Sequence, residues 1–200
     1  MPRTEEANQR IREQRREQIL DTASRVFASK GLTGTRIADI ATEGDMSQGL
    51  IFRYFASKEE IFAAVLDKAL QSATRLAQDA LQQPCSPLEK LRWLLQVSLS
   101  GMWRKPDYIL VILHALNSET TPQEARELVL EQSKQTLQLY RQLIVEGQEA
   151  GEVVQDDPDQ LTMMFAACVQ GLSSGVLYLP RMLGIDKPPD PEVVLRILKA

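Results

Sequence analysis

The spacing of the apolar residues constrains the fold of this chain more than any other feature of its sequence. Between sparse prolines and glycines, apolar residues recur three and four positions apart, and no stretch alternates in the way a strand would. Ile19, Ala23 and Phe27 lie on one such stripe, and Gly31 follows them where a glycine commonly ends a helix. The pattern predicts an all-α fold with a first helix from about residue 9 to Gly31.

Capping residues predict where the next helices begin. Thr35 is placed to cap a second helix that stops at Gly44, and Ser47 to cap a third that runs to Phe55. Ser57 opens the run Ser-Lys-Glu-Glu, which is a capping box and predicts a fourth helix. We therefore expect four helices in roughly the first 80 residues.

The rest of the chain reads as longer helices. The fourth helix is expected to run to about residue 81, and a proline-containing break follows it. Several of the later helices have proline in their first turn, where the missing N–H does no harm. Their expected ranges are 87–104, 107–117, 122–150, 158–179 and 190–199. The sequence thus predicts a small N-terminal unit, residues 1–56, and a helical body, residues 57–200.

The charge is unevenly distributed along the chain. The net charge is −4, but residues 1–60 hold ten basic and ten acidic residues, so all of the negative excess lies further on. Within this first part, Arg10, Arg12, Arg15 and Arg16 form a basic cluster. A locally positive face is therefore compatible with an acidic protein.

Several classes of protein fit this sequence poorly. Cys85 and Cys168 are too few and too isolated for a disulfide framework or a CxxC site. The longest apolar run, Tyr108 to Leu116, is about half of what a membrane span needs, and the N-terminus is charged where a signal peptide is apolar. We expect a cytoplasmic protein with no membrane span, no metal and no cofactor.

Two short helices joined by a tight turn have the dimensions of a helix-turn-helix, whose second helix lies in the major groove of DNA. Residues 35–43 and 47–55 provide them. The turn between them needs a left-handed residue, which Asp45 tolerates and Gly44 permits. Helix pairs of this kind also occur in proteins that do not bind DNA, so the geometry alone leaves the function open.

Residues 31–62 contain a characteristic series of short motifs: Gly34-Thr35, Ile40-Ala41, Ser47, Phe52-Arg53-Tyr54-Phe55 and Ser57-Lys58-Glu59-Glu60-Ile61. With these motifs the segment closely resembles the DNA-binding segment of the TetR/AcrR family of transcriptional regulators. Phe52 stands where the family commonly has tyrosine, and Leu50 where threonine is common. The resemblance implies a homodimeric repressor that binds a pseudo-palindromic operator and responds to a small-molecule effector.

The exposed positions of this segment are the expected DNA contacts. Gln48 can pair with an adenine edge, and Arg53 with guanine or a phosphate. A glycine weakens an isolated helix, so its presence at position 49 suggests that another backbone approaches closely there. That backbone is either DNA or a neighbouring helix. The full expected set is Thr35, Arg36, Ser47, Gln48, Gly49, Phe52, Arg53, Tyr54 and Lys58, with capping or a solvated surface as the alternative for several of them.

The resemblance also implies an effector pocket in the body. Soft and aromatic side chains suit an irregular cavity, although core packing explains each of them as well. The expected ligand-binding residues are Met102, Trp103, His114, Tyr140, Met164, Phe165 and Cys168. His114 is the single histidine of the chain, and its place in an apolar run favours a hydrogen-bonded core position over ligand contact.

Two apolar segments are candidates for the dimer interface. Residues 168–178 place small residues on a helix and permit close approach of another helix. The final segment adds Val193, Val194, Leu195, Ile197 and Leu198, with contacts inside one chain as the alternative.

Two other classes of function remain open at this point. One is a helical carrier or interaction bundle that does not bind DNA. The other is an enzyme, which would have to use His114, because the chain has no HExxH, GxSxG, Walker or GxGxxG motif.

Overall fold

The structure is a computed structural model, and it describes residues 5–119, 121–175 and 179–200. Within these residues the chain forms helices and no strand beyond an isolated bridge between Val153 and Lys199, which confirms the all-α fold. The helices are α1 (Glu5–Gly34), α2 (Ile37–Glu43), α3 (Gln48–Phe52), α4 (Lys58–Leu81), α5 (Pro87–Arg104), α6 (Asp107–Asn117), α7 (Gln123–Glu149), α8 (Pro158–Gly175), α9 (Leu179–Leu183) and α10 (Pro191–Leu195).

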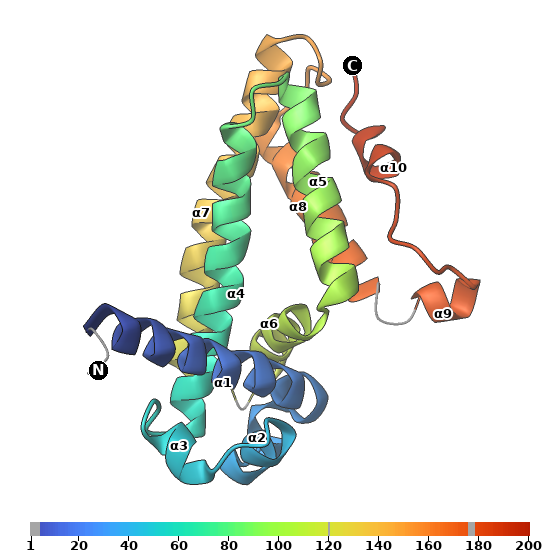
Figure 1. Ribbon diagram of the computed structural model, residues 1–200. Coiled ribbons are helices and arrows are strands. Elements are labelled where there is room, and N and C mark those ends of the chain that lie inside the picture. Colours follow the sequence, from blue (N-terminus) through green and yellow to red (C-terminus); the bar gives the residue numbers. More distant parts are fainter. Residues whose placement is uncertain (1–4, 120, 176–178) are drawn as a thin grey trace.

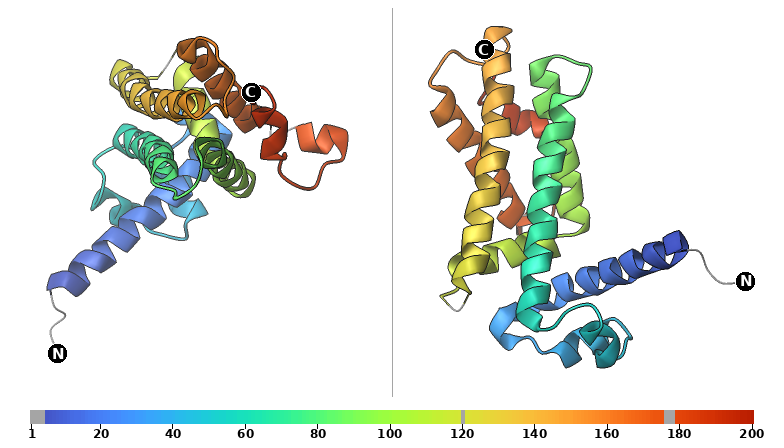
Figure 2. Two further views of the ribbon diagram at one scale, coloured as in Figure 1. Left: turned by 90° about the horizontal axis from the view of Figure 1, so that it is seen from above. Right: turned by 90° about the vertical axis from the view of Figure 1, so that its left-hand side faces the viewer.

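The long helices form a body, and the three N-terminal helices form a head at one end of it. Figure 1 shows α4, α5, α7 and α8 running along the body, while α1 crosses the lower end of α4 and α2 and α3 lie beyond it. The N-terminal part of α1 projects away from the body, as both views in Figure 2 show. Helix α4 begins beside the head and continues far into the body, so one helix connects the two parts.

Helix α1 is interrupted at Gly31, as expected, but it starts earlier than expected. Its first described residue is Glu5, not residue 9. Gly31 interrupts the helix with φ 66° and ψ 178°, a conformation that is essentially restricted to glycine. The expected end of the regular helix is therefore confirmed at this residue.

The turn between α2 and α3 uses both expected residues, in different ways. Asp45 has φ 48° and is the single described non-glycine residue with a positive φ. Gly44 has φ −95°, but a Cβ on it would lie 3.1 Å from the Thr22 side chain of α1. Asp45 thus turns the chain, and Gly44 lets the turn pack against α1.

Two of the three predicted caps are confirmed. The Ser47 side chain accepts a hydrogen bond from the Leu50 amide (3.1 Å), and the Ser57 side chain accepts one from the Glu60 amide (3.1 Å). Thr35 is not a cap, because the N-cap of α2 is Arg36, whose amide donates to the Asp39 carboxylate (2.7 Å).

Two helices end before their expected limits. Helix α3 stops at Phe52 and a turn replaces its expected last residues, although the Phe55 amide still donates to the Ile51 carbonyl. Helix α10 covers only 191–195 of the expected 190–199. The prediction that α8 extends to residue 179 falls partly on residues 176–178, which lie outside the described residues.

Two apolar cores hold the molecule together. The first joins the head to the lower body, and at its centre Phe27 of α1 meets Phe62 of α4 edge to face, with ring centroids 5.1 Å apart. The second lies in the upper body and includes an edge-to-face pair of Tyr140 and Phe165 at 5.2 Å. The expected boundary between residues 56 and 57 falls at the start of α4, whose first turns pack within the head core.

Part of the predicted dimer interface is buried inside the chain. Val194, Leu195 and Leu198 belong to the second core, where α10 packs against α5. These three residues therefore make the contacts within one chain that the sequence left as the alternative. Val193 and Ile197 remain exposed. Among the described residues, no helix combines the length and the apolar character needed to cross a membrane.

Candidate DNA-binding surface and ligand cavity

Helix α3 turns one face to the core and the other to solvent. Ile51 is buried in the head core and anchors the helix. Gln48, Gly49 and Arg53 are exposed, and Phe52, a large apolar residue, is 53% exposed. This face can present hydrogen-bonding and apolar groups to base edges.

The surroundings of Gly49 decide between two interpretations of this glycine. A Cβ built at Gly49 meets no atom of the described chain within 4 Å. Close packing of a neighbouring helix in the same chain is therefore excluded as its reason. The open space on this side of α3 leaves room for a partner from outside the chain.

Three further predicted contacts lie elsewhere in the head. Ser47 is exposed and caps α3, and Arg36 is exposed at the start of α2. Tyr54 is half-buried and packs against the head core, so its ring supports the surface from below.

Thr35 and Lys58 have different roles from those that the sequence indicates. Thr35 is fully buried, and its hydroxyl donates to the carbonyl of Gly31 at 2.6 Å, so the side chain is not available to a phosphate. Lys58 donates from Nζ to the carbonyls of Leu32 and Thr35, both at 3.0 Å, and of Thr33 at 3.5 Å. An ammonium group has three protons, so these carbonyls occupy all of its donors. Both residues tie the end of α1 to the rest of the head.

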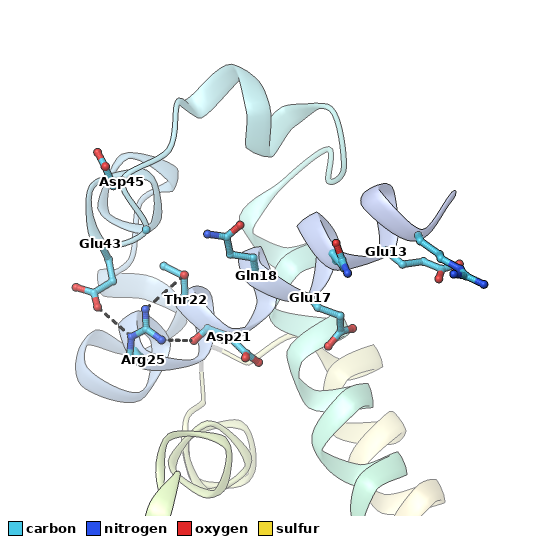
Figure 3. Close-up of a pocket in the computed structure, with 11 residues that line it drawn as sticks. Glu13, Glu17, Gln18, Asp21, Thr22, Arg25, Glu43 and Asp45 are labelled. Atoms are coloured by element: carbon cyan, nitrogen blue, oxygen red, sulfur yellow. Dashed lines mark hydrogen bonds and ion pairs between the residues drawn. The ribbon is translucent and has the colours of Figure 1, made fainter. Parts of the chain in front are cut away.

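A shallow cleft between α1 and the α2–α3 turn has the wrong charge for DNA. Its walls carry more carboxylates than guanidinium groups, and one of its arginines, Arg25, is paired with Glu43 at 3.0 Å (Figure 3). The lining includes Arg10, Glu13, Glu17, Asp21, Arg25, Glu43 and Asp45. A phosphate backbone would be repelled here, so this cleft is poorly suited to DNA.

The body contains a cavity of about 950 Å³ between α4, α5, α6, α7 and α8. Most of its lining is apolar. Two of the seven predicted ligand-binding residues, Met102 and Tyr140, line it. Burial raises the pKa of Tyr140 to about 12. Among the described residues, no group of three His, Cys, Asp or Glu side chains could hold a metal ion.

The other five predicted ligand-binding residues lie outside the lining of the cavity. His114 points to the head, with Nδ1 3.3 Å from the carbonyl oxygen of Phe27, as the favoured core role implies. Phe165 and Cys168 pack in the second core. Met164 is exposed on α8, and Trp103 is half-buried near the end of α5. A helix presents only some of its residues to a cavity, and spacing alone does not select which ones.

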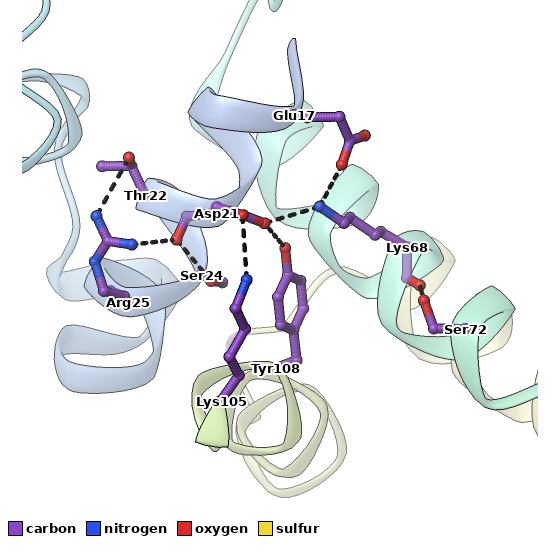
Figure 4. A network of polar contacts seen from close by, with 9 residues as sticks. All are labelled: Glu17, Asp21, Thr22, Ser24, Arg25, Lys68, Ser72, Lys105 and Tyr108. Atoms are coloured by element: carbon purple, nitrogen blue, oxygen red, sulfur yellow. Dashed lines mark hydrogen bonds and ion pairs between the residues drawn. The ribbon is translucent and has the colours of Figure 1, made fainter. Parts of the chain in front are cut away.

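Sequence reasoning missed the two lysines at the polar end of the cavity. Lys68, Lys105 and Tyr108 line the end nearest to the head, and all three contact Asp21 of α1 (Figure 4). The Tyr108 hydroxyl donates to Asp21 at 2.5 Å, Lys68 donates to it at 2.8 Å, and Lys105 lies 3.5 Å away. Lys68 also pairs with Glu17. The sequence shows that these lysines stand next to apolar segments, but it does not show that their side chains face the cavity and Asp21.

The pKa values in this network reflect both burial and hydrogen bonds. Burial favours the neutral form of Asp21, but hydrogen bonds from Lys68 and Tyr108 outweigh it and lower the pKa of this carboxyl. Burial and the hydrogen bond to Asp21 raise the pKa of Tyr108 to about 12. Asp21 is therefore charged and Tyr108 neutral at physiological pH.

The head and the cavity together define the class of protein: an all-α protein with a helix-turn-helix head and a helical body that contains a cavity. Two family models agree with this class. The model described as bacterial regulatory proteins of the tetR family matches residues 19–65, and that of the tetracyclin repressor-like C-terminal domain matches residues 84–174. The chain belongs to the TetR family of transcriptional regulators.

Individual relatives are regulators too. The chain is 26% identical over 138 residues to the transcriptional repressor KstR2 of Mycobacterium tuberculosis, covering 68% of each chain. It is 29% identical over 144 residues to the transcriptional repressor NicS of Pseudomonas putida, covering 68% of this chain and 64% of that one. A solved transcriptional regulator from Saccharomonospora viridis, in complex with choline, aligns with a TM-score of 0.72 and 25% identity over 92% of this chain and 94% of that one.

Proposed function

We propose that the chain is a homodimeric repressor that binds a pseudo-palindromic operator and is released from it by a small, largely apolar effector bound in the body. The exposed face of α3 is the observation that carries the DNA-binding part. Gln48 and Arg53 supply hydrogen bonds for base edges, and Gly49 lets the DNA approach the helix closely. Arg36 and Ser47 are the flanking contacts to phosphates.

The body supports the effector part of the proposal. An apolar cavity with a few polar groups is the usual form of a small-molecule site. Helix α4 lines it from Lys68 to Asp79 and also carries Phe62, which packs in the head core. A ligand that changes the position of α4 therefore changes the position of α3. The regulator from Saccharomonospora viridis, solved with choline, shows that one protein of this fold holds a small organic ligand.

An apolar surface on the C-terminal helices is suited to the dimer interface. Large apolar residues are exposed on and around α8, α9 and α10: Met163, Met164, Met182, Leu183, Ile185, Val193 and Ile197. Monomeric proteins seldom expose so many large apolar side chains on adjacent elements. A symmetric dimer would present two α3 helices to successive major grooves, about 34 to 36 Å apart or somewhat more.

The proposal is tested on DNA fragments selected by the protein from random sequence. We expect a pseudo-palindromic consensus, with protection of both half-sites in footprinting. Replacing Gln48 with alanine should reduce the ratio of operator to random-DNA affinity by roughly 5- to 150-fold, the effect of about 1 to 3 kcal/mol of lost base discrimination. Gln138→Ala on the exposed surface of α7 is the matched control and should bind as the wild type does.

Three results would contradict separate parts of the proposal. Equal losses on operator and random DNA for Gln48→Ala would remove Gln48 as a base reader. Protection of a single half-site by a monomer would remove the dimer. Compounds that raise the melting temperature but leave operator affinity unchanged would remove the coupling between effector and DNA.

A further inference from the structure

Asp21 is the point at which the head is attached to the wall of the cavity. It lies on α1, and its carboxylate accepts hydrogen bonds from Lys68 of α4 and Tyr108 of α6. Lys105, the residue after α5, lies 3.5 Å from the same carboxylate. Figure 4 shows these side chains converging on Asp21 from three directions. Lys68 Nζ also lies 5.4 Å from the centroid of the Tyr108 ring, so the donors themselves are in contact. This cluster of Asp21, Lys68, Lys105 and Tyr108 is called the junction below.

The three donors of the junction are also part of the cavity lining, whereas Asp21 is not. The end of the cavity nearest to the head is therefore lined by two lysines and a tyrosine, whose polar groups contact Asp21 and, for Lys68, also Glu17. Three other charged residues also line the cavity. On α4, Arg75 and Asp79 follow Lys68 by about 10 Å and about 16 Å at the helical rise of 1.5 Å per residue, and Asp159 is paired with Arg141. The remaining lining is largely apolar, and two of its three cations, Lys68 and Lys105, lie at the end nearest to the head.

We propose that the cavity takes an amphipathic carboxylate, whose acidic group binds Lys68, Lys105 and Tyr108 in competition with Asp21, so that binding detaches α1 from the body. The proposal rests on the proposed function and names the chemical class of its effector. A carboxylate has the same geometry and charge as the Asp21 side chain, so the junction donors can exchange one for the other. An apolar tail would fill the interior of the cavity and remove apolar surface from water.

Competition explains how binding in the body reaches the head. Asp21 lies between Leu20 and Thr22, which are both buried in the head, so its contacts fix the position of α1 against α4 and α6. Once the ligand takes the donors, Asp21 returns to water and this restraint on α1 is lost. The ligand therefore binds the cavity more tightly when the head is detached than when it is attached. This difference in affinity is what couples effector binding to DNA binding.

The charge preference is tested with three probes of equal chain length: decanoate, decanol and decyltrimethylammonium. Binding to the full-length protein is followed by calorimetry, below the concentrations at which the probes form micelles. We expect decanoate to bind roughly tenfold or more tightly than decanol, the effect of one charge-assisted hydrogen bond, and the cation to bind weakest. Lys105 is exposed, so its replacement should not impair folding. We expect Lys105→Gln to remove much of the preference for decanoate over decanol.

The competition with Asp21 is tested by Asp21→Asn, which removes the competing charge and keeps the size of the side chain. We expect decanoate affinity to rise by roughly fivefold or more, and operator affinity without ligand to fall, because the head is less restrained. Asp79→Asn is the matched control, since it removes a carboxylate from the cavity lining far from the junction and should not alter operator affinity. A melting temperature for each variant separates these effects from a loss of folding.

Each result either supports or overturns the inference. If decanol binds as tightly as decanoate, or decanoate does not bind, the cavity does not select carboxylates. If decanoate binds preferentially but Asp21→Asn leaves its affinity unchanged, the junction donors do not exchange Asp21 for the ligand. In both cases operator binding and its release by another compound would still stand, so failure of this inference is distinguishable from failure of the proposed function.

Discussion

Gly49 is the residue at which stability and DNA binding make opposite demands. Alanine is a better helix former than glycine, and the space beside Gly49 is open. We expect Gly49→Ala to raise the free energy of unfolding by up to about 1 kcal/mol and to weaken operator binding, because the added methyl group occupies the side from which DNA approaches. Denaturant unfolding and gel-shift titration measure the two effects.

The matched control for Gly49 is Gly101→Ala on α5, where a Cβ also meets open space. This variant should gain similar stability and keep its operator affinity. A Gly49→Ala protein that binds the operator as tightly as the wild type would contradict close approach of DNA at this residue.

Tyr108 gives the junction a measurable pH dependence. Its pKa in the folded protein is about 12, above the ordinary value of 10.0, so folding favours its neutral form. The stabilisation is fully present below pH 10 and is lost as the pH rises toward 12. We expect Tyr108→Phe to lower the free energy of unfolding by about 1 to 2 kcal/mol at neutral pH, because Asp21 loses a hydrogen bond.

The test is the difference in the free energy of unfolding between the wild type and Tyr108→Phe as a function of pH. This difference should be constant up to about pH 10 and should shrink above it. Tyr140, whose pKa is also about 12, titrates in both proteins and so cancels in the comparison. A difference that does not change between pH 10 and 12 would show that Tyr108 is not held neutral by the junction.

At the scale of the element, the kink in α1 is the feature that shapes the head. Gly31 adopts a backbone conformation that a residue with a Cβ reaches only with strain. We expect Gly31→Ala to lower the free energy of unfolding by about 1 to 3 kcal/mol. Thermal or denaturant unfolding of the full chain measures this loss.

Gly34→Ala is the control for this prediction, since Gly34 lies in the same helix without a positive φ and a Cβ there meets only Lys30 at an ordinary 3.5 Å. It should leave stability unchanged or raise it slightly. Equal stability of the two variants would mean that the kink relaxes into a regular helix without cost.

At the scale of the whole molecule, the exposed apolar residues of α8 to α10 are predicted to hold two copies together. Met164 is exposed on α8 and does not line the cavity. We expect Met164→Lys to raise the dissociation constant of the dimer by roughly tenfold or more, because the symmetric interface contains the residue twice. Analytical ultracentrifugation measures the constant, and operator affinity should fall with the fraction of dimer.

Leu130→Lys provides the matched control, since Leu130 is an equally exposed apolar residue on α7, outside the predicted interface. It should leave the dimer intact. If Leu130→Lys dissociates the dimer and Met164→Lys does not, the interface lies on a different face of the body.

Local features of the sequence determined much of this protein. The three- and four-residue apolar spacing predicted the helices, Gly31 and Asp45 marked the kink and the turn, and Ser47 and Ser57 marked two helix starts. These signals are local, because a helix and its caps depend on residues within a few positions of one another. The helix-turn-helix is also a contiguous segment, so the match of residues 31–62 to the family pattern was enough to predict the DNA-binding function.

Only the tertiary structure decided which side chains meet across helices. Lys58 was expected at a phosphate but faces the carbonyls at the end of α1. The sequence left two roles open for His114, a core position and a ligand contact, and its contact with the Phe27 carbonyl favours the first. Asp21 and Tyr108 are far apart in the chain and share a hydrogen bond. The direction of each side chain depends on how whole helices pack and rotate against one another, and this is set by the summed burial of both cores.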